Sequence, residues 1–376
     1  MNWHIITGEY PPQRGGVSDY TELVARGLAD AGDSVVVWAP PAQGSEARYR
    51  GVDVRRLPDR FGPRSLRILS ADLNRGRQPH RLLVQYVPHA FGWKAANVPF
   101  CMWLRLRRRD RIWVMFHEVS FPFDLHAGVR LNALAGVNRL MASLVGGAAE
   151  RAFVSIPAWR SGVGSVTPAG TPVTWLPVPS GIPPVRDPSA TAIVRAQYGG
   201  GRPIVGHFGT YGRLIAPLLE QCINALVELS ACRVLLLGHG SAAACHELVA
   251  KNPRLLDRVY GVGELPADDL SRHISACDLM LQPYPDGVST RRTTAMVALA
   301  HGIPVVSTSG LLTEAIWAKS GIAVLSPAND LLRLVTETVT LLNDPARRAE
   351  LSRHASATYD EQFDLRHTIG ALRFPA

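Results

Sequence analysis

Apolar runs of strand length alternate with segments of helical periodicity throughout this chain, and no other feature limits its possible folds so strongly. Residues 3–7 form a short apolar run, residues 17–31 carry apolar side chains at helical spacing, and residues 35–38 form a second apolar run. A strand, a helix and a strand in this order make a right-handed βαβ unit, in which the two strands are parallel. The start of the chain therefore predicts an α/β fold built on a parallel sheet.

The alternation is interrupted once and then starts again. Residues 171–203 are rich in proline and glycine and are expected to form a linker. Before them, further strands are expected at 81–87, 112–116 and 152–156. After them, strands are expected at 203–208, 234–237, 259–261, 278–282, 303–307 and 322–325, and helices at 214–229, 266–276, 291–301 and 330–343. Because 376 residues exceed what one hydrophobic core usually organises, two domains are predicted.

The predicted architecture is a pair of Rossmann-like, doubly wound parallel-sheet domains that face each other across a cleft. We expect them at residues 1–180 and 181–360, with a C-terminal helix at 361–376 that packs back on the first domain. Open parallel sheets bind ligands beyond the carboxyl ends of their strands. The loops at those ends are therefore expected to carry the functional residues.

One such loop lies in the segment QPYPDGVSTRRTTAMVALAHGIPVV, residues 282–306, and combines a turn with a basic pair and a helix start. Proline and glycine residues end the preceding strand, and Arg291 with Arg292 opens the next helix. The unpaired N–H groups of a helix start favour an anion by about 0.3 to 1 kcal/mol, and guanidinium groups donate in pairs to phosphate oxygens. We interpret this loop as a phosphate-binding corner; an ordinary loop with solvated arginines is the alternative.

A glycine pair follows the first predicted strand. Gly15 and Gly16 would let the backbone approach a phosphate or a sugar, and Ser18 and Asp19 are placed to cap the following helix. A glycine pair in a tight turn is equally common for structural reasons alone.

Two further strand ends carry candidate side chains. His117 and Glu118 follow the strand at 112–116, and a histidine there can exchange a proton near neutral pH or donate a hydrogen bond to a sugar hydroxyl. Arg213 follows the strand at 203–208, where it would reach the same anion as the arginine pair. A structural histidine and a solvated arginine are the ordinary alternatives.

Sequence motifs for metal sites and for enzyme nucleophiles are not found. The chain has no Asp-x-Asp motif, no H-E-x-x-H, no G-x-S-x-G elbow and no Walker loop, and its glycine spacing is not that of a dinucleotide site. The five cysteines are scattered without a C-x-x-C pair, which is typical of reduced thiols in a cytosol and argues against structural zinc. No metal or cofactor is expected, so a phosphate leaving group would be stabilised by cationic side chains and a helix start.

The positive charge is unevenly distributed along the chain. Residues 1–180 hold 22 Lys or Arg against 13 Asp or Glu, whereas residues 181–376 hold 18 of each kind. An apolar run at 98–104 is followed by five basic residues, Arg105, Arg107, Arg108, Arg109 and Arg111. Such a segment fits an anionic membrane surface, where each basic residue contributes roughly 1 kcal/mol, and it fits a helix packed on a sheet with a solvated basic end equally well. No nucleic-acid-binding signature accompanies the charge, so nucleic acid is not an expected partner.

Secretion and membrane insertion are not expected. The start MNWHIITGEYPP lacks a basic region followed by an apolar core, and it is typical of a first strand and a turn. The best candidate for a membrane span, residues 131–149, is interrupted by Asn132, Asn138 and Arg139 and is better explained as a helix of the fold. A cytoplasmic protein is predicted, with contact at the inner face of the plasma membrane as an option.

These segments together resemble the GT-B glycosyltransferases of family 4, which are retaining enzymes that use nucleotide sugars. The resemblance covers nearly the whole chain and is carried by YPPQRGGVSDY, the His-Glu pair, FGTYGR, LLLGHG, YGVGELPADDLSRHISACDLMLQPYPDG and ALAHGIPVVSTSG. It implies that Gly15 and Gly16 face the sugar phosphate and the acceptor, and that His117 lies by the anomeric carbon. It also implies that Arg213 holds the diphosphate and that residues 262–265 line the base pocket.

The chain departs from the family at its Glu-x7-Glu pair, whose positions hold Asp286 and Thr294. Asp286 is one methylene shorter and can still accept hydrogen bonds from donor-sugar hydroxyls. Thr294 is neutral and offers the ribose a bond of about 0.5 to 1.5 kcal/mol, compared with about 1.5 to 3 kcal/mol for a charged partner. Arg213 takes the place of the family's lysine, and Arg291 with Arg292 supplies the other basic charge. We infer a variant site.

The expected site follows from these comparisons. The predicted catalytic residues are His117, Arg213 and Asp286, and the predicted donor-binding residues are Gly15, Gly16, Glu118, Val262, Gly263, Glu264, Leu265, Gly287, Val288, Ser289, Thr290, Arg291, Arg292 and Thr294.

The implied reaction moves a sugar from a nucleoside-diphosphate sugar to a glycan or polyprenyl-linked glycan acceptor with retention, in bacterial polysaccharide or glycoconjugate synthesis. Attack on the face from which the diphosphate leaves needs no enzyme nucleophile. The loss of both glutamates keeps open a non-catalytic nucleotide-sugar-binding or scaffold subunit. A nicotinamide-dependent oxidoreductase is disfavoured because G-x-G-x-x-G is missing.

Overall fold

The computed structural model describes residues 1–376 except 45–48, 76–79, 122, 124–127 and 375–376. Its chain divides into two compact units, one formed by Met1–Pro177 with Leu365–Ala376 and the other by Val178–Asp364. The corresponding predicted ranges are 1–180 with 361–376, and 181–360. Each unit is built on one parallel sheet, which confirms the predicted α/β class.

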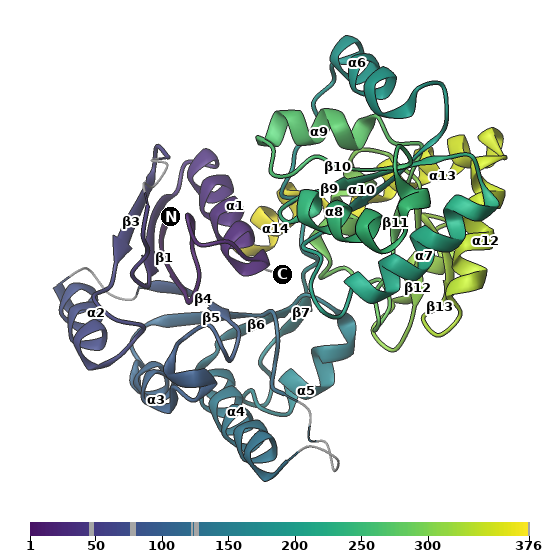
Figure 1. Ribbon diagram of the computed structural model, residues 1–376. Coiled ribbons are helices and arrows are strands. Elements are labelled where there is room, and N and C mark those ends of the chain that lie inside the picture. Colours follow the sequence, from purple (N-terminus) through teal and green to yellow (C-terminus); the bar gives the residue numbers. More distant parts are fainter. Residues whose placement is uncertain (45–48, 76–79, 122, 124–127, 375–376) are drawn as a thin grey trace. The chain divides into compact units, whose positions relative to one another are not determined.

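The first unit has a seven-stranded sheet in the order β3-β2-β1-β4-β5-β6-β7 (Figure 1). Its strands are β1 (Asn2–Thr7), β2 (Ser34–Ala39), β3 (Val52–Arg56), β4 (Arg81–Tyr86), β5 (Arg111–Phe116), β6 (Arg151–Val154) and β7 (Val173–Trp175). One face is covered by α2 (Pro63–Arg75), α3 (Val98–Leu106), α4 (Val129–Ala148) and α5 (Arg160–Gly164), with the short helices η1 (Trp93–Ala95) and η2 (Pro157–Trp159) in the connecting segments. Burial on both faces explains why the central strands are continuous apolar runs.

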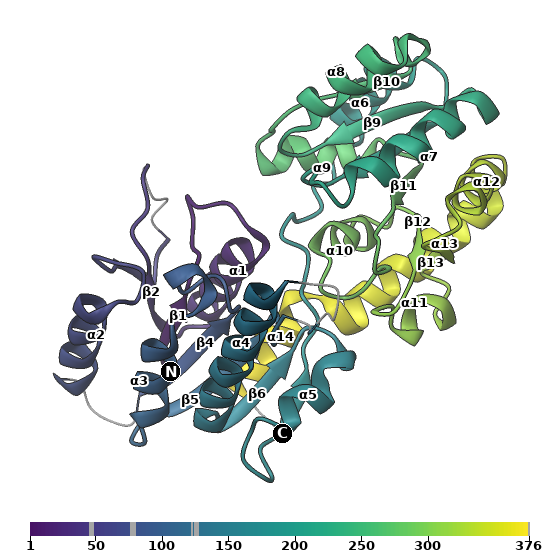
Figure 2. The same cartoon turned by 60° about the horizontal axis from the view of Figure 1, so that its bottom comes forward.

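The other face of this sheet is covered by α1 (Gly16–Asp30) and by α14 (Leu365–Arg373) from the end of the chain. Figures 1 and 2 both show the yellow α14 among the elements of the first unit. The two helices approach closely at Gly27, where a Cβ would lie 2.8 Å from Ile369 Cδ1. A side chain at position 27 would therefore require Ile369 to shift. The last two residues of the helix predicted at 361–376 lie outside the described residues.

The second unit has a six-stranded sheet in the order β10-β9-β8-β11-β12-β13. Its strands are β8 (Ile204–Phe208), β9 (Arg233–Leu237), β10 (Val259–Gly261), β11 (Leu279–Gln282), β12 (Val305–Ser309) and β13 (Ala323–Pro327). One face packs on α7 (Ala216–Leu229), α8 (Ser241–Lys251) and α12 (Leu331–Leu342), and the other on α6 (Pro188–Gly199), α9 (Ala267–Ser275), α10 (Thr293–Ala300) and α13 (Pro345–Thr358). The remaining short elements are η3 (Pro253–Leu255), α11 (Ala315–Lys319) and the π-helix η4 (Tyr359–Phe363).

The prediction that residues 171–203 form a linker is wrong for two segments. The range contains β7, the outermost strand of the first sheet, and α6, a helix of the second unit. The prediction also lacked β3, the strand at the opposite edge of the first sheet. Both missed strands are partly exposed edge strands, so neither carries the apolar run that identifies a buried strand.

Candidate functional site

The second sheet has its point of divergence at the centre, between β8 and β11. From β8 the chain runs outward through β9 and β10, and from β11 it runs outward on the other side through β12 and β13. The loops after β8 and β11 therefore leave the sheet in opposite directions, and open parallel sheets bind ligands where this happens. Arg213 lies on the first of these loops, and the segment from Asp286 to Thr294 lies on the second. The topology thus brings the predicted residues to one edge of one sheet.

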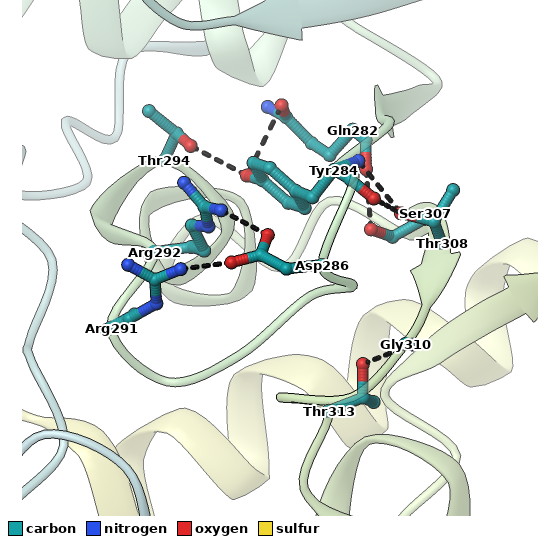
Figure 3. A network of polar contacts seen from close by, with 10 residues as sticks. All are labelled: Gln282, Tyr284, Asp286, Arg291, Arg292, Thr294, Ser307, Thr308, Gly310 and Thr313. Carbon is teal, nitrogen blue, oxygen red and sulfur yellow. Dashed lines mark hydrogen bonds and ion pairs between the residues drawn. The ribbon is translucent and has the colours of Figure 1, made fainter. Parts of the chain in front are cut away.

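Asp286 is the centre of a charged cluster on the β11–α10 loop. One of its carboxylate oxygens accepts a hydrogen bond from Arg291 Nη2, and the other accepts from Arg292 Nη2 (Figure 3). The three side chains are 21 to 28% exposed, so a ligand can reach them. The sequence predicted that the arginines bind an anion and that Asp286 binds sugar hydroxyls. The structure shows that these groups bind each other.

Tyr284 supports this cluster through its contact with Arg292 and was missed in the sequence. Its hydroxyl lies 2.8 Å from Thr294 Oγ1, and its ring centroid lies 4.6 Å from the Arg292 guanidinium carbon (Figure 3). Burial raises the pKa of Tyr284 to about 12, so the phenol stays neutral. The position predicted to bind the ribose is thus already hydrogen-bonded to a neutral partner. An aromatic residue between Pro283 and Pro285 was the available signal.

The middle of the β11–α10 loop is buried, and its backbone is hydrogen-bonded to β12. The side chains of Val288, Ser289 and Thr290 are fully buried, and Val288 N–H donates to the Thr308 carbonyl at 2.8 Å. Gly287 has a φ of 84°, and a Cβ there would lie 2.2 Å from Thr313 Oγ1. These side chains therefore lie inside the loop, and the role of residues 287–290 in binding the donor stays a prediction.

Glu314 clamps the same loop and was also missed in the sequence. It lies before α11 and accepts hydrogen bonds from Thr290 N–H at 3.0 Å, from Thr290 Oγ1 at 2.6 Å and from Trp317 Nε1 at 2.9 Å. Burial raises the pKa of Glu314. No periodicity or motif marks this residue, because its partner is a backbone group 24 residues away in the sequence.

The β8–α7 loop presents Arg213 to solvent at the same edge. Arg213 is exposed, and within the described parts of the chain it makes no ion pair. Beneath this loop, His207 is 2% exposed, and its Nδ1–H donates to the Leu281 carbonyl at 2.9 Å. Burial lowers the pKa of His207 to about 4, so the ring is neutral at physiological pH. Arg213 is therefore a solvated cation, and the histidine beneath its loop carries no charge.

The residues predicted to line a base pocket follow β10, the outermost strand on one side. Gly263 N–H donates to Ser241 Oγ at 2.8 Å, and Glu264 lies 3.8 Å from His239 Nδ1. Val262 and Leu265 are partly buried. These contacts join the ends of β9 and β10, and the role of residues 262–265 in binding a base stays a prediction.

In the first unit, the glycine pair forms the start of α1. Gly15 precedes the helix in an extended conformation, and a Cβ at Gly16 would meet no atom within 4 Å. The predicted capping by Ser18 and Asp19 is wrong, because the helix begins at Gly16 and no side chain caps it. Ser18 Oγ donates to the Gln13 carbonyl at 2.5 Å instead.

His117 follows β5 and packs in an edge-to-face contact against Tyr20 of α1, 4.8 Å between ring centroids. Its Nε2 lies 2.8 Å from Gln85 Oε1, within hydrogen-bond distance. Burial lowers the pKa of His117 to about 3. A neutral hydrogen-bonding role therefore fits the side chain better than proton exchange near neutral pH. Glu118 is 41% exposed and lies 3.8 Å from His89 Nδ1.

The basic segment of the first unit lies at the end of α3 and before β5. Phe100 and Leu104 are fully buried in the core, whereas Met102 and Leu106 are 44% and 66% exposed. Arg107 pairs with Asp110, and Arg111 pairs with Glu150 at 2.7 Å. The segment is therefore a helix packed on the sheet whose outer side remains apolar and basic. Within the described residues, no helix combines the length and the apolarity that a bilayer span requires.

Comparison with known proteins links the second unit to a family. Residues 202–344, from β8 to the end of α12, match the family model described as Glycosyl transferases group 1. The match lies entirely within the second unit. This match confirms the enzyme class predicted from the sequence, a glycosyltransferase. A search of curated protein sequences gave no match.

Several solved structures share the fold of this glycosyltransferase over nearly its whole length. Sucrose-phosphate synthase from Thermosynechococcus elongatus is 18% identical with a TM-score of 0.75, and the match covers 99% of this chain and 97% of that one. HepE from Anabaena, in complex with UDP, is 17% identical with a TM-score of 0.70 over 99% and 98% of the two chains. WaaG, a glycosyltransferase involved in lipopolysaccharide biosynthesis, is 13% identical with a TM-score of 0.69 over both whole chains. These similarities confirm the predicted GT-B fold.

Proposed function

We propose that the protein is a retaining glycosyltransferase of family 4 that transfers a sugar from a nucleoside-diphosphate sugar to a glycan or polyprenyl-linked glycan. The proposal is carried by Arg213, Arg291 and Arg292, which the second sheet brings to its point of divergence. A basic cluster at this point fits the diphosphate of a nucleotide sugar. Because HepE has been solved with UDP and with UDP-glucose, UDP-sugars are the first donors to test.

In the proposed reaction, the acceptor hydroxyl attacks the anomeric carbon on the face from which the diphosphate leaves. The bond between the anomeric carbon and the phosphate oxygen breaks, and the leaving phosphate takes the proton of the acceptor hydroxyl. Charge grows on the diphosphate during this step, and the three arginines together with the start of α10 would stabilise it. No nucleophile of the enzyme takes part.

Other predicted residues receive supporting roles in this proposal. Residues 262–265 would line the base pocket, and Gly15 and Gly16 would allow the backbone to approach the substrates. His117 would hydrogen-bond to the substrate as a neutral ring, because burial lowers its pKa to about 3. No resident cofactor or metal enters this mechanism.

The acceptor side of the proposal includes contact with an anionic membrane surface. The exposed Leu106 lies with Arg108 and Arg109 in the lining of an open hollow of about 500 Å³, to which Asn74, Arg107 and Asp110 also contribute. An apolar and basic surface of this kind binds anionic headgroups. It would bring the enzyme to lipid-linked acceptors at the inner face of the plasma membrane, in bacterial polysaccharide or glycoconjugate synthesis.

The test is to incubate the purified protein with a panel of nucleotide sugars, with and without membrane lipid extract, and to measure release of nucleoside diphosphate. We expect release from at least one donor. No release with any donor, even with the extract present, would overturn the proposal. Tight binding without release would favour a non-catalytic nucleotide-sugar-binding subunit, the alternative that Asp286 and Thr294 raise.

A further inference from the structure

A fully buried glutamine lies at the carboxyl end of the first sheet, and no step of the proposed reaction uses it. Gln85 is the last but one residue of β4, which lies between β1 and β5 (Figure 1), and its side chain is 0% exposed. The three residues before it, Leu82, Leu83 and Val84, are apolar and buried. A buried amide lowers stability unless it is hydrogen-bonded. The hydrogen bonds of Gln85 therefore indicate its role.

Within the described residues, the amide of Gln85 hydrogen-bonds to His117 and to no other side chain. Gln85 Oε1 lies 2.8 Å from His117 Nε2, whereas Gln85 Nε2 is buried without a hydrogen-bond partner in the part of the chain that the structure describes. A leucine or a methionine would fill a similar volume and leave no polar group unpaired. The contact with His117 is therefore what an amide provides at this position and an apolar side chain would not.

Two contacts together hold the ring of His117. Gln85 bonds to Nε2, and Tyr20 of α1 packs against the ring with 4.8 Å between the centroids and an angle of 78° between the planes. Tyr20 is itself 3% exposed, so it is fixed by the core. His117 is partly exposed, and its Nδ1 makes no hydrogen bond to any described residue. Nδ1 is therefore the ring nitrogen that can bind a substrate.

We propose that Gln85 is a positioning residue, which holds the His117 imidazole in one orientation and one tautomer so that Nδ1 meets the sugar substrate. The inference rests on the proposed function, in which His117 hydrogen-bonds to the substrate as a neutral ring. A neutral imidazole has one donor and one acceptor nitrogen. The hydrogen bond at one nitrogen decides which of the two carries the proton, so Gln85 decides what Nδ1 offers to the substrate.

The groups around the ring leave this choice to Gln85. From α1, Tyr20 contacts the ring, and burial raises the pKa of this phenol, so it stays neutral. On the loop of His117 itself, the Glu118 carboxylate lies 3.8 Å from His89 Nδ1. Burial lowers the pKa of His117 to about 3. A carboxylate in place of the Gln85 amide would therefore bring a charge to a neutral contact.

The test follows the ring nitrogens of His117 by NMR in protein with isotopically labelled histidine, and His117→Gln identifies the signals. We expect the wild type to show the two well-separated nitrogen signals of a single tautomer and no protonation of the ring near neutral pH. In Gln85→Met, the two signals should approach each other as the tautomers exchange. In Gln85→Glu, the carboxylate should raise the pKa of His117 by about 1 to 3, because an opposite charge favours the protonated ring.

Turnover of a nucleotide sugar is measured on the same variants. Gln85→Met should lower turnover by about tenfold, because the ring is no longer held in the productive orientation. Gln85→Glu should lose activity as the pH falls toward the raised pKa of His117, since protonation removes the acceptor of the ring. The wild type should show no such loss in the same pH range.

Asn138 of α4 offers a matched control. It is also a fully buried amide of the first unit, its Nδ2 donates to the Ala95 carbonyl at 2.6 Å, and its Oδ1 has no partner among the described residues. Asn138→Leu and Asn138→Asp therefore repeat both kinds of change away from His117. They should leave the His117 signals as in the wild type and turnover within about twofold of it, since distant sites act independently. Melting temperatures report folding for every variant.

The outcomes separate this inference from the proposed function. Identical His117 signals in the wild type and in Gln85→Met and Gln85→Glu, all folded, would overturn the inference and leave the proposed function standing. If Gln85→Glu does not fold, Gln85→Met alone decides. Altered ring signals with unchanged turnover would also overturn the positioning role. A wild type that turns over no nucleotide sugar would overturn the proposed function, and with it any role of Gln85 in the reaction, even where the ring signals change as expected.

Discussion

The two sheets of this protein end in loops of different chemistry, although both sheets are parallel and doubly wound. The carboxyl edge of the second sheet carries Arg213 and the paired Arg291 and Arg292. At the carboxyl edge of the first sheet, His117 is neutral, and His89 lies 3.8 Å from Glu118. The second edge thus carries an arginine cluster suited to a phosphate group. The first carries neutral and acidic groups suited to hydroxyls together with basic side chains such as Arg60, whose charge partly offsets the rise that burial causes in the pKa of Glu9.

This difference is the reverse of what the charge of each half suggests. The excess positive charge of the chain lies in residues 1–180, yet its densest segment, Arg105 to Arg111, precedes β5 at the amino ends of the strands. The electrically balanced second half holds the arginines at the carboxyl ends. The direction of the strands, rather than the net charge of a domain, therefore decides where an anion site can form.

The largest effect on turnover is expected from Arg292→Ala, which tests whether the arginine pair of the second edge takes part in the reaction. Removal of one charged donor from a phosphate in the transition state typically lowers turnover by about 10² to 10³. We expect that loss in nucleoside-diphosphate release, with an unchanged melting temperature. Arg202→Ala is the matched control, because Arg202 is exposed and precedes β8 at the amino edge of the same sheet. Equal turnover in both variants would remove the arginine pair from the mechanism.

A smaller effect is expected from Glu314→Ala, which tests the rigidity of the second edge. The substitution leaves Thr290 N–H, Thr290 Oγ1 and Trp317 Nε1 without their acceptor. A buried donor without a partner costs about 1 to 3 kcal/mol, so we expect the loss of the acceptor for these three donors to lower the free energy of unfolding by about 3 kcal/mol or more. Urea denaturation measures the loss, and turnover should fall by about tenfold as the loop loosens. A variant as stable as the wild type would show that Glu314 does not hold the loop.

A third prediction concerns two neutral histidines, His207 of the second sheet and His117 of the first. Burial lowers the pKa of His207 to about 4 and that of His117 to about 3, compared with an ordinary value of 6.5. Because these pKa values are lowered, the stabilisation is complete above pH 6.5 and is lost as the pH falls toward 4 and 3. Each histidine should therefore reduce the free energy of unfolding by roughly 1 kcal/mol per pH unit below 6.5.

Denaturation at pH 7 and pH 5 checks this slope in the wild type, His117→Gln and His207→Gln. Each substitution should make stability less dependent on pH. An identical slope in all three proteins would mean that neither histidine is held neutral by the fold.

The smallest effect is expected at the other end of the first sheet. Arg108→Ala combined with Arg109→Ala should change turnover of a water-soluble donor by less than about twofold, because exposed charges far from the reacting groups are screened. The same variant should sediment less with anionic vesicles than the wild type does. A large loss of turnover without membranes would place these arginines near the donor and contradict the comparison.

The sequence allowed much of this fold to be predicted, because buried parallel strands are apolar runs that stand out between helices. Edge strands β3 and β7 lack such runs and were missed. At the site, the arginines and Asp286 could be located because they follow predicted strands. Their mutual pairing, the support from Tyr284 and the clamp by Glu314 depend on side-chain contacts across loops, which spacing along the chain does not encode. The pKa of His117 was likewise set by packing against α1.

The most direct test of the central claim is a titration of UDP, GDP and ADP against the wild type and Arg292→Ala, followed by calorimetry or by the shift in melting temperature. The account predicts that at least one diphosphate binds the wild type, and that the arginine variant binds it at least tenfold more weakly. Equal binding to both proteins, or no binding of any diphosphate to the wild type, would contradict the assignment of the second sheet's carboxyl edge as the donor site.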